Sequence, residues 1–128
     1  EEISETELQD LLTWFKTTLG ERVTEVRASK RLTDSPAIVL SPYGSHSMQK
    51  IMMHMTGEKL NIPAGILELN SRHKIIKGIN ELRKANDPFA KEAAEQVLEN
   101  AQLAAGLILD QRNMVTRLYS ILERAVSH

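Results

Sequence analysis

The chain has 128 residues, which is long enough for one compact domain with a hydrophobic core and too short for two. Sixteen Lys and Arg against seventeen Asp and Glu leave a formal net charge of −1, so no long-range attraction draws the chain to nucleic acid or to an anionic membrane. The absence of cysteine excludes disulfides and thiolate metal sites and is typical of a reducing compartment. We therefore expect a single domain over residues 1–128 with no nucleic-acid, membrane or metal partner.

The ends of the chain carry no targeting segment that the sequence reveals. No apolar run approaches the roughly 20 residues that cross a bilayer, and the N-terminus is acidic, unlike that of a signal peptide. Because the chain begins with Glu1 and not with methionine, we expect it to be a piece of a longer protein.

The first predicted element is a helix. Residues 4–7 (Ser-Glu-Thr-Glu) form a capping-box pattern, in which Ser4 accepts from the Glu7 amide while the Glu7 side chain reaches back. Apolar residues follow at helical spacing from Leu8 to Leu19, and Gly20 is expected to end the helix.

Three short strands come next. Residues 22–28 and 37–40 read as strands joined by turn residues, and this short connection predicts that they are antiparallel neighbours. Residues 66–69 (Ile-Leu-Glu-Leu) are the third predicted strand.

A methionine-rich helix is predicted between the second and third strands. Met48, Ile51, Met52 and Met55 lie at positions i, i+3, i+4 and i+7. Methionine is flexible and polarizable, which suits a surface that accepts many apolar partners. The same spacing is also expected of ordinary core residues that pack on the sheet.

Three helices complete the chain. Asn70 is the predicted N-cap of a helix over residues 71–85, whose apolar face carries Ile75, Ile76, Ile79 and Leu82. Asp87 followed by a proline predicts a helix that runs to about Leu107, and Asp110 is expected to cap the last helix. The order of elements predicts an α+β fold, with a small three-stranded sheet and two long helices at the end.

The last two helices have more apolar surface than one domain needs. The first of them has a stripe with alternating spacings of four and three, formed by Ala90, Ala94, Val97, Ala101, Ala104 and Ile108. The last helix has two adjacent stripes, Met114, Leu118, Ile121 and Ala125, and Val115, Tyr119, Leu122 and Val126. If its own domain covers one stripe, a second copy that covers the other would complete a four-helix bundle. The alternative is that the whole apolar surface lies in a monomer core.

No catalytic motif is present. The sequence has no Walker loop, HExxH or GxSxG pattern. His46 and His54 are too far apart along the chain to share a helix face, and His73 is expected to be a packing or capping residue. Glu68, Glu95 and Glu99 have no sequence feature that would pair them. We expect no enzymatic activity in this chain.

Several stretches together resemble one known family. Residues 19–23 (LGERV), 31–39 (RLTDSPAIV), 67–70 (LELN) followed by His73, and 100–107 (NAQLAAGL) are similar to the C-terminal domain of heat-shock protein 90 chaperones. The resemblance covers essentially the whole chain. The last residues, 126–128, lack the acidic tail of the eukaryotic cytosolic members, so the resemblance is to the bacterial and mitochondrial branch.

The resemblance implies a function. It implies the constitutive homodimerisation domain of an ATP-dependent stress-response chaperone, with ATP and magnesium bound by an N-terminal domain that this chain lacks. It implies a bacterial cytoplasmic location, or alternatively the mitochondrial matrix. It also implies that Met48, Ile51, Met52 and Met55 contact unfolded client proteins. The expected dimer interface consists of Val97, Ala101, Ala104, Ile108, Met114, Val115, Leu118, Tyr119, Ile121, Leu122 and Ala125. The alternative from another class is a free-standing α+β protein-binding module with its terminal helices in a monomer core.

Overall fold

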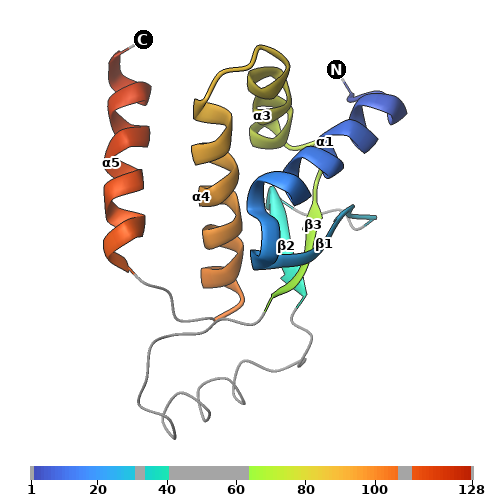
Figure 1. Ribbon diagram of the computed structural model, residues 1–128, viewed down its shortest axis with the longest axis horizontal. Coiled ribbons are helices and arrows are strands. Elements are labelled where there is room, and N and C mark those ends of the chain that lie inside the picture. Colours follow the sequence, from blue (N-terminus) through green and yellow to red (C-terminus); the bar gives the residue numbers. More distant parts are fainter. Residues whose placement is uncertain (1, 31–33, 41–63, 107–110, 128) are drawn as a thin grey trace, which may run out of the picture.

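The computed structural model describes residues 2–30, 34–40, 64–106 and 111–127, without the side chains of 111–113 (Figure 1). These residues form an α+β arrangement of four α-helices, one short 3₁₀ helix and a three-stranded sheet. In chain order the elements are α1 (Glu5–Leu19), η1 (Gly20–Arg22), β1 (Val23–Ala28), β2 (Ala37–Leu40), β3 (Gly65–Leu69), α3 (Lys74–Lys84), α4 (Phe89–Ala104) and α5 (Gln111–Ser127).

Helix α1 begins and ends as its sequence predicts. The Ser4 hydroxyl accepts a hydrogen bond from the Glu7 amide at 3.2 Å, which confirms one half of the capping box. The Glu7 carboxylate makes its contacts elsewhere, accepting hydrogen bonds from Asn80 and Lys84 on α3. Gly20 has a φ of 62°, a conformation that only glycine adopts without strain, and the helix stops there.

The order of strands in the sheet is β1-β3-β2, so the prediction that β1 and β2 are neighbours is wrong. Strand β3 lies between them, parallel to β1 and antiparallel to β2. The two ends of the β1–β2 connection are attached to β3, because the Ser29 amide donates to the Leu69 carbonyl and the Asn70 amide donates to the Pro36 carbonyl, both at 2.8 Å. Leu67 and Leu69 of β3 are fully buried, so the strand with the most buried side chains takes the centre.

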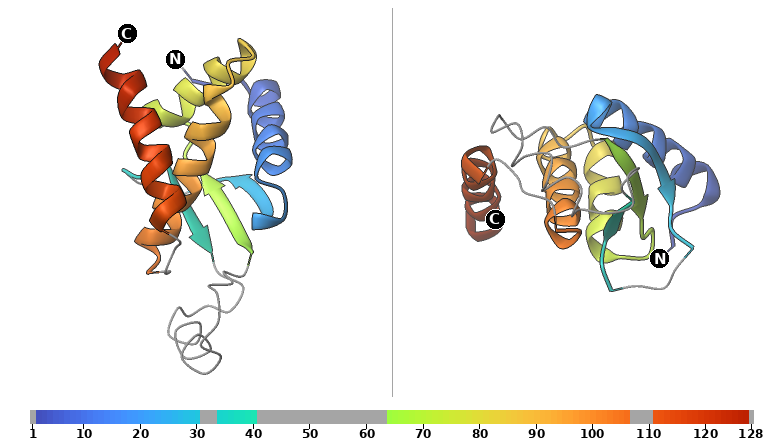
Figure 2. Two further views of the ribbon diagram at one scale, coloured as in Figure 1. Left: turned by 60° about the vertical axis from the view of Figure 1, so that its left-hand side comes forward. Right: turned by 90° about the horizontal axis from the view of Figure 1, so that it is seen from below.

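Helices α1, α3 and α4 supply the core, together with one face of the sheet. Figure 2 shows α4 and α3 beside the sheet and α5 beyond α4, on the side away from the strands. Leu11, Phe15 and Leu19 of α1 are buried. They belong to one cluster with Leu67 and Leu69 of β3, Ile76 and Ile79 of α3, and Ala94, Val97, Leu98 and Ala101 of α4.

The start of α3 differs from the prediction. The helix begins at Lys74, and its N-cap is His73, whose Nδ1 accepts from the Ile75 amide at 3.0 Å. This confirms the capping role considered for His73. Asn70 is not the N-cap, because its side-chain oxygen accepts from the Arg72 amide in a turn before the helix. Ile75 is exposed, so it does not belong to the buried face of α3.

Helix α4 begins one residue later than its sequence predicts, at Phe89 with Pro88 as its N-cap, and it ends earlier. The Asp87 Oδ1 accepts from the Phe89 amide at 2.9 Å, as a side-chain cap does. The helix ends at Ala104, three residues before the predicted end, and Gly106 has a φ of 87° in the turn that follows. Asp110, the predicted cap of the last helix, lies outside the described residues.

Candidate protein-interaction surface

Helix α5 has one side that faces α4. Figures 1 and 2 show the two helices side by side. Met114 is buried and Ile121 is half-buried on α5. The guanidinium of Arg117 lies 3.5 Å from Glu95 of α4 and also donates to Glu99. Among the described apolar side chains of α5, Met114 alone is buried, with 7% of its surface exposed.

A second ion pair joins the far end of α5 to the start of α4. Arg124 donates to Asp87 at 2.7 Å, and its guanidinium carbon lies 4.6 Å from the centre of the Phe89 ring. The hydrogen bond from Arg124, with a smaller contribution from the Phe89 amide, lowers the pKa of Asp87 below its usual value. The same hydrogen bond to Asp87 raises the pKa of Arg124.

The other side of α5 is apolar and exposed. We define the α5 apolar surface as Val115, Leu118, Tyr119, Leu122 and Val126, whose exposed fractions range from 37% for Leu118 to 80% for Val126. They are five of the seven large hydrophobic residues exposed in the described part of the chain. At about 100° per residue, all five point to one side of the helix. A contiguous apolar patch of this kind is typical of a protein-interaction site.

The α4 residues of the predicted interface differ in their exposure to solvent. Val97 and Ala101 are each 5% exposed and belong to the core cluster of their own domain, while their place in the interface stays a prediction. The small side chains of the α4 stripe allow close packing inside the domain. Ala104 is exposed at the end of α4, and Ile108 lies outside the described residues.

The α5 part of the predicted interface separates into two groups. Met114 and Ile121 lie on the side with α4, and Met114 is only 7% exposed. Ala125 is exposed along with the predicted residues Val115, Leu118, Tyr119 and Leu122. Two exposed residues were missing from the predicted interface, Val126 on α5 and Leu103 near the end of α4. The 115–119–122–126 spacing already contained the signal for Val126.

Comparison with known proteins identifies the family of the chain. A family profile described as Hsp90 protein matches residues 1–128. The chain belongs to the Hsp90 family. It is 56% identical over 124 residues to the chaperone protein HtpG of Desulfitobacterium hafniense, which covers 97% of this chain and 20% of that protein. It is 41% identical over 133 residues to HtpG of Desulfotalea psychrophila, covering 98% of this chain and 21% of that protein.

A mitochondrial protein is also similar to this Hsp90-family chain. The rat heat shock protein 75 kDa, mitochondrial, is 37% identical over 130 residues, which cover 98% of this chain and 18% of that protein. The chain thus spans about one fifth of the length of the curated relatives it matches. The relatives include bacterial and mitochondrial proteins, and the predicted membership of the Hsp90 family is confirmed.

The predicted client-binding helix of this Hsp90-family chain lies outside the described residues. Met48, Ile51, Met52 and Met55 all belong to residues 41–63. Their role in client contact stays a prediction from the family resemblance.

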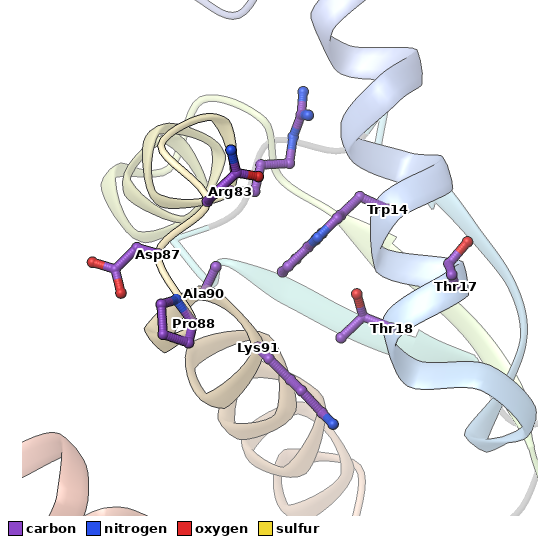
Figure 3. A pocket seen from close by; sticks show the side chains of 9 residues that line it. Trp14, Thr17, Thr18, Arg83, Asp87, Pro88, Ala90 and Lys91 are labelled. Atoms are coloured by element: carbon purple, nitrogen blue, oxygen red, sulfur yellow. The ribbon is translucent and has the colours of Figure 1, made fainter.

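Hollows lie beside α4 among the described residues of the Hsp90-family domain. One, of about 410 Å³, lies between α1 and the start of α4 (Figure 3). Trp14, Thr18 and Lys91 line it, while Arg83 and Asp87 at its edge already have partners in Asn80 and Arg124. Within the described residues no cluster of three His, Cys, Asp or Glu side chains could hold a metal ion. The described helices also include none long and apolar enough to span a membrane.

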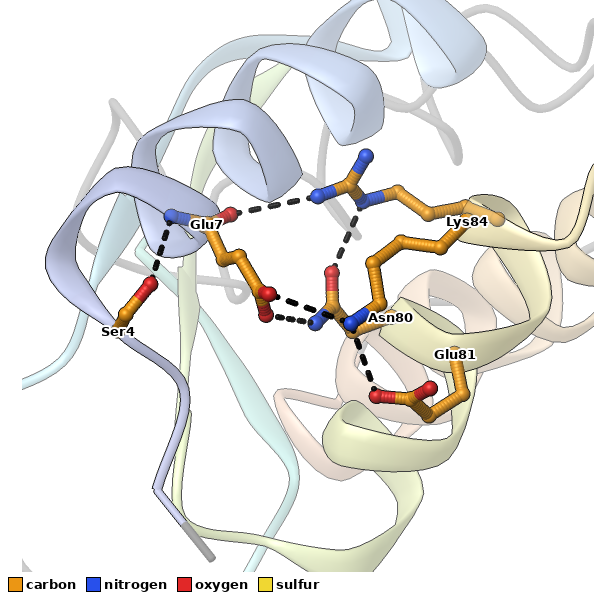
Figure 4. Close-up of polar contacts among 6 residues, drawn as sticks. Ser4, Glu7, Asn80, Glu81 and Lys84 are labelled. Carbon is orange, nitrogen blue, oxygen red and sulfur yellow. Dashed lines mark hydrogen bonds and ion pairs between the residues drawn. The ribbon is translucent and has the colours of Figure 1, made fainter.

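A polar network joins α1 to α3 on the far side of the Hsp90-family domain from α5 (Figure 4). Asn80, which is 1% exposed, donates to Glu7 at 3.1 Å, and Lys84 donates to Glu7 at 3.2 Å. Hydrogen bonds from Lys84 and then Asn80 lower the pKa of Glu7, and hydrogen bonds to Glu81 and then Glu7 raise the pKa of Lys84. These groups pair with one another, so the network connects two helices and presents no reactive group.

Proposed function

We propose that this chain is the homodimerisation domain of an Hsp90-family molecular chaperone, and that the α5 apolar surface pairs with the same surface of a second copy. The observation that supports this proposal most directly is the exposure of Val115, Leu118, Tyr119, Leu122 and Val126 on one side of one helix. Burying these side chains against a partner would remove apolar area from water, which is the main favourable term in protein association.

A second copy of the chain is a suitable partner for this surface. Apolar residues on this surface are separated by alternating steps of three and four residues, as in helices that pack on a copy of themselves. The steps run from Val115 through Leu118 or Tyr119 to Leu122. In a two-fold dimer the same surface is used on both sides, so a self-complementary apolar stripe is sufficient. Leu103 and Ala104 at the end of α4 are exposed and would border the pair of α5 helices, so that α4 and α5 of both copies form a four-helix bundle.

The chemistry of the chaperone would belong to other parts of a longer protein. We propose that ATP and magnesium bind outside this chain, in an N-terminal domain, and that the chain itself is not an enzyme. Pairing two copies would raise the concentration of their ATPase domains for each other, so that closure becomes an intramolecular step. The higher identity to a bacterial relative, 56% against 37% for the mitochondrial one, favours a bacterial cytoplasmic protein over one of the mitochondrial matrix.

The alternative of a free-standing binding module with both terminal helices in a monomer core has less support. Helix α4 is in the core, as that alternative expects. Helix α5 is not, because Tyr119 and Leu122 are 65% and 56% exposed. A partner for α5 is therefore required in either case, and family membership favours a second copy.

The chaperone role also includes contact with unfolded client proteins. We assign this contact to Met48, Ile51, Met52 and Met55 because membership of the Hsp90 family favours it and methionine suits a surface that accepts many apolar partners. Met52→Ser is expected to weaken the binding of an unfolded client severalfold without changing the melting temperature of the chain. A large loss of stability in this variant would show that Met52 is a core residue.

Subunit pairing between two tagged copies of the chain tests the dimer proposal. Two copies with different affinity tags are expressed in the same cells. The fraction of the protein that is retained on both affinity columns in succession is then measured. Leu122→Glu is expected to abolish pairing because it places a charge within the apolar contact. Ile75→Glu is the matched control, since Ile75 is 47% exposed on α3, away from α5. If Leu122→Glu still pairs as the unaltered chain does, the α5 apolar surface is not the interface.

A further inference from the structure

Ion pairs between α5 and the α4 side contribute to the contact that holds α5 on its own domain. We define the α4–α5 ion-pair cluster as Asp87, Glu95 and Glu99 on the α4 side and Arg117 and Arg124 on α5. Arg117 contacts both Glu95 and Glu99, while Arg124 contacts Asp87 and stacks on Phe89. The two arginines are seven residues apart, so they lie on the same side of α5.

The inner half of the cluster is sheltered from water. The side chains of Arg117, Glu95 and Glu99 are 13%, 17% and 17% exposed. Partly buried charges interact more strongly than surface pairs and are screened less by salt. The Glu95 carboxylate also accepts from Arg22 of η1 at 3.0 Å, so alternating charges connect the end of α1 through α4 to α5.

The cluster fixes the direction in which the α5 apolar surface faces. From Arg117 to Leu122 the helix advances five residues, or about 140° after a full turn is removed. The apolar surface therefore faces away from α4 when Arg117 faces Glu95 and Glu99. A rotation of α5 about its axis would break the ion pairs and turn Leu122 and Tyr119 toward or away from a partner by the same angle.

We propose that Arg117 and Arg124 are positioning residues for subunit pairing, and that the α4–α5 ion-pair cluster makes the pairing weaken as ionic strength rises. This inference rests on the proposed dimer. Salt screens the outer pair most, since the side chains of Arg124 and Asp87 are 47% and 25% exposed, whereas apolar burial is not weakened by salt and is strengthened by kosmotropic salts. The sign of the salt effect therefore separates a surface oriented by charges from one that depends on apolar contact alone.

Charge exchange between Arg117 and Glu99 tests the proposal. Asp87 is unsuitable for exchange because it also caps α4. The dissociation constant of the dimer is measured by sedimentation equilibrium in 50 mM and 1 M sodium chloride for the unaltered chain, Arg117→Glu and the double variant Glu99→Arg/Arg117→Glu. Arg72→Glu is the matched control, since Arg72 forms only a surface pair with Glu2, at 3.8 Å and two-thirds exposed.

The proposal predicts a specific order of affinities at low salt. Arg117→Glu raises the dissociation constant about tenfold or more, which is the size of effect expected when one partner of a sheltered ion pair is reversed. The double variant returns it to within about threefold of the unaltered chain. Arg72→Glu leaves it unchanged, and 1 M salt weakens the unaltered dimer. Equal affinity of Arg117→Glu and the unaltered chain, or failure of the double variant to recover, overturns the proposal.

A second measurement tests the position of α5 independently of pairing. Because the chain has no cysteine, spin labels can be attached at Lys91→Cys on α4 and Glu123→Cys on α5, diluted with unlabelled chain. The proposal predicts a narrow distance distribution that broadens with Arg117→Glu and in 1 M salt. If the unaltered chain is a monomer at every concentration, the proposed function is contradicted. The distance distribution is measured within one chain, so it would still show whether the α4–α5 ion-pair cluster positions α5. An unchanged distribution in Arg117→Glu would overturn the positioning role.

Discussion

The domain formed by α1, the sheet, α3 and α4 differs from α5 in how each treats its apolar residues. Leu11 and Phe15 of α1 are completely buried, whereas Tyr119 and Leu122 of α5 are more than half exposed. Both helices have amphipathic sequences, and the pattern is stronger in α5. Helical periodicity therefore identifies the apolar face of a helix. The structure of one chain shows whether that chain covers this face itself.

The two regions also differ in their polar contacts. Helix α1 is joined to α3 through Glu7, Asn80 and Lys84, but an apolar core lies beneath that network. Helix α5 is joined to its domain by the ion pairs of Arg117 and Arg124. Among its described apolar side chains, Met114 alone is buried. The network on α1 adds to a contact that apolar packing already fixes, whereas the cluster on α5 accompanies the burial of Met114 and Ile121.

The largest expected effect is on the free energy of unfolding, when a core side chain and a side chain of the α5 apolar surface are each truncated to alanine. Phe15→Ala should lower the free energy of unfolding by about 3–5 kcal/mol, because it leaves a cavity in the core. Tyr119→Ala should change it by less than about 1 kcal/mol in dilute chain, because the ring is exposed within one chain. Urea denaturation at a concentration below the dimer dissociation constant measures both. A Tyr119→Ala loss as large as that of Phe15→Ala would mean that α5 packs into its own domain.

A smaller effect is expected from two glycines within the domain. A Cβ at Gly65 would lie 2.6 Å from the Leu40 carbonyl oxygen, so Gly65→Ala should push β2 from β3 and cost about 1–3 kcal/mol. A Cβ at Gly78 in α3 would meet nothing within 4 Å, so Gly78→Ala should stabilise the chain by about 0.5–1 kcal/mol. Thermal unfolding of the two variants should shift in opposite directions. A shift of the same sign in both would contradict the strand pairing described.

The smallest expected effect concerns acid and the α4–α5 contact. Arg124 and the Phe89 amide lower the pKa of Asp87 in the folded chain below the usual 3.8. The stabilisation is therefore present above pH 3.8 and is lost as pH falls through the lower pKa of the folded state. Asp87→Asn keeps the helix cap without the charge, so its melting temperature should lie below that of the unaltered chain at pH 6. The two should converge near pH 2, and a difference that stays constant over this range would exclude a role for the charge.

The parts of the fold that depend on nearby residues could be predicted from the sequence. Ser4 and Asp87 cap their helices through their own side chains, and Gly20 ends α1 through its own φ. The strand order could not be predicted in this way, because β3 enters between β1 and β2 from more than twenty residues further along the chain. A short connection favours a hairpin between two strands only when no third strand of greater apolar character competes to pair with them.

The candidate interface shows the same division. The two stripes of α5 could be predicted to need two partners, because together they cover about half of the helix, and α4 covers only the side with Met114. The stripe on α4 was assigned to a partner by the same spacing, yet Val97 and Ala101 pack inside the domain. Spacing cannot distinguish a domain core from a subunit interface, because both exclude water in the same way.

The mass of the chain in solution tests the central claim most directly. Sedimentation equilibrium from high to low micromolar concentration, in 50 mM salt, should give twice the 14.4 kDa of one chain at the upper end. Dilution should lower the mass toward that of one chain only as the dissociation constant is approached. A mass of 14.4 kDa at every concentration would contradict the proposal that the α5 apolar surface pairs two copies of the chain.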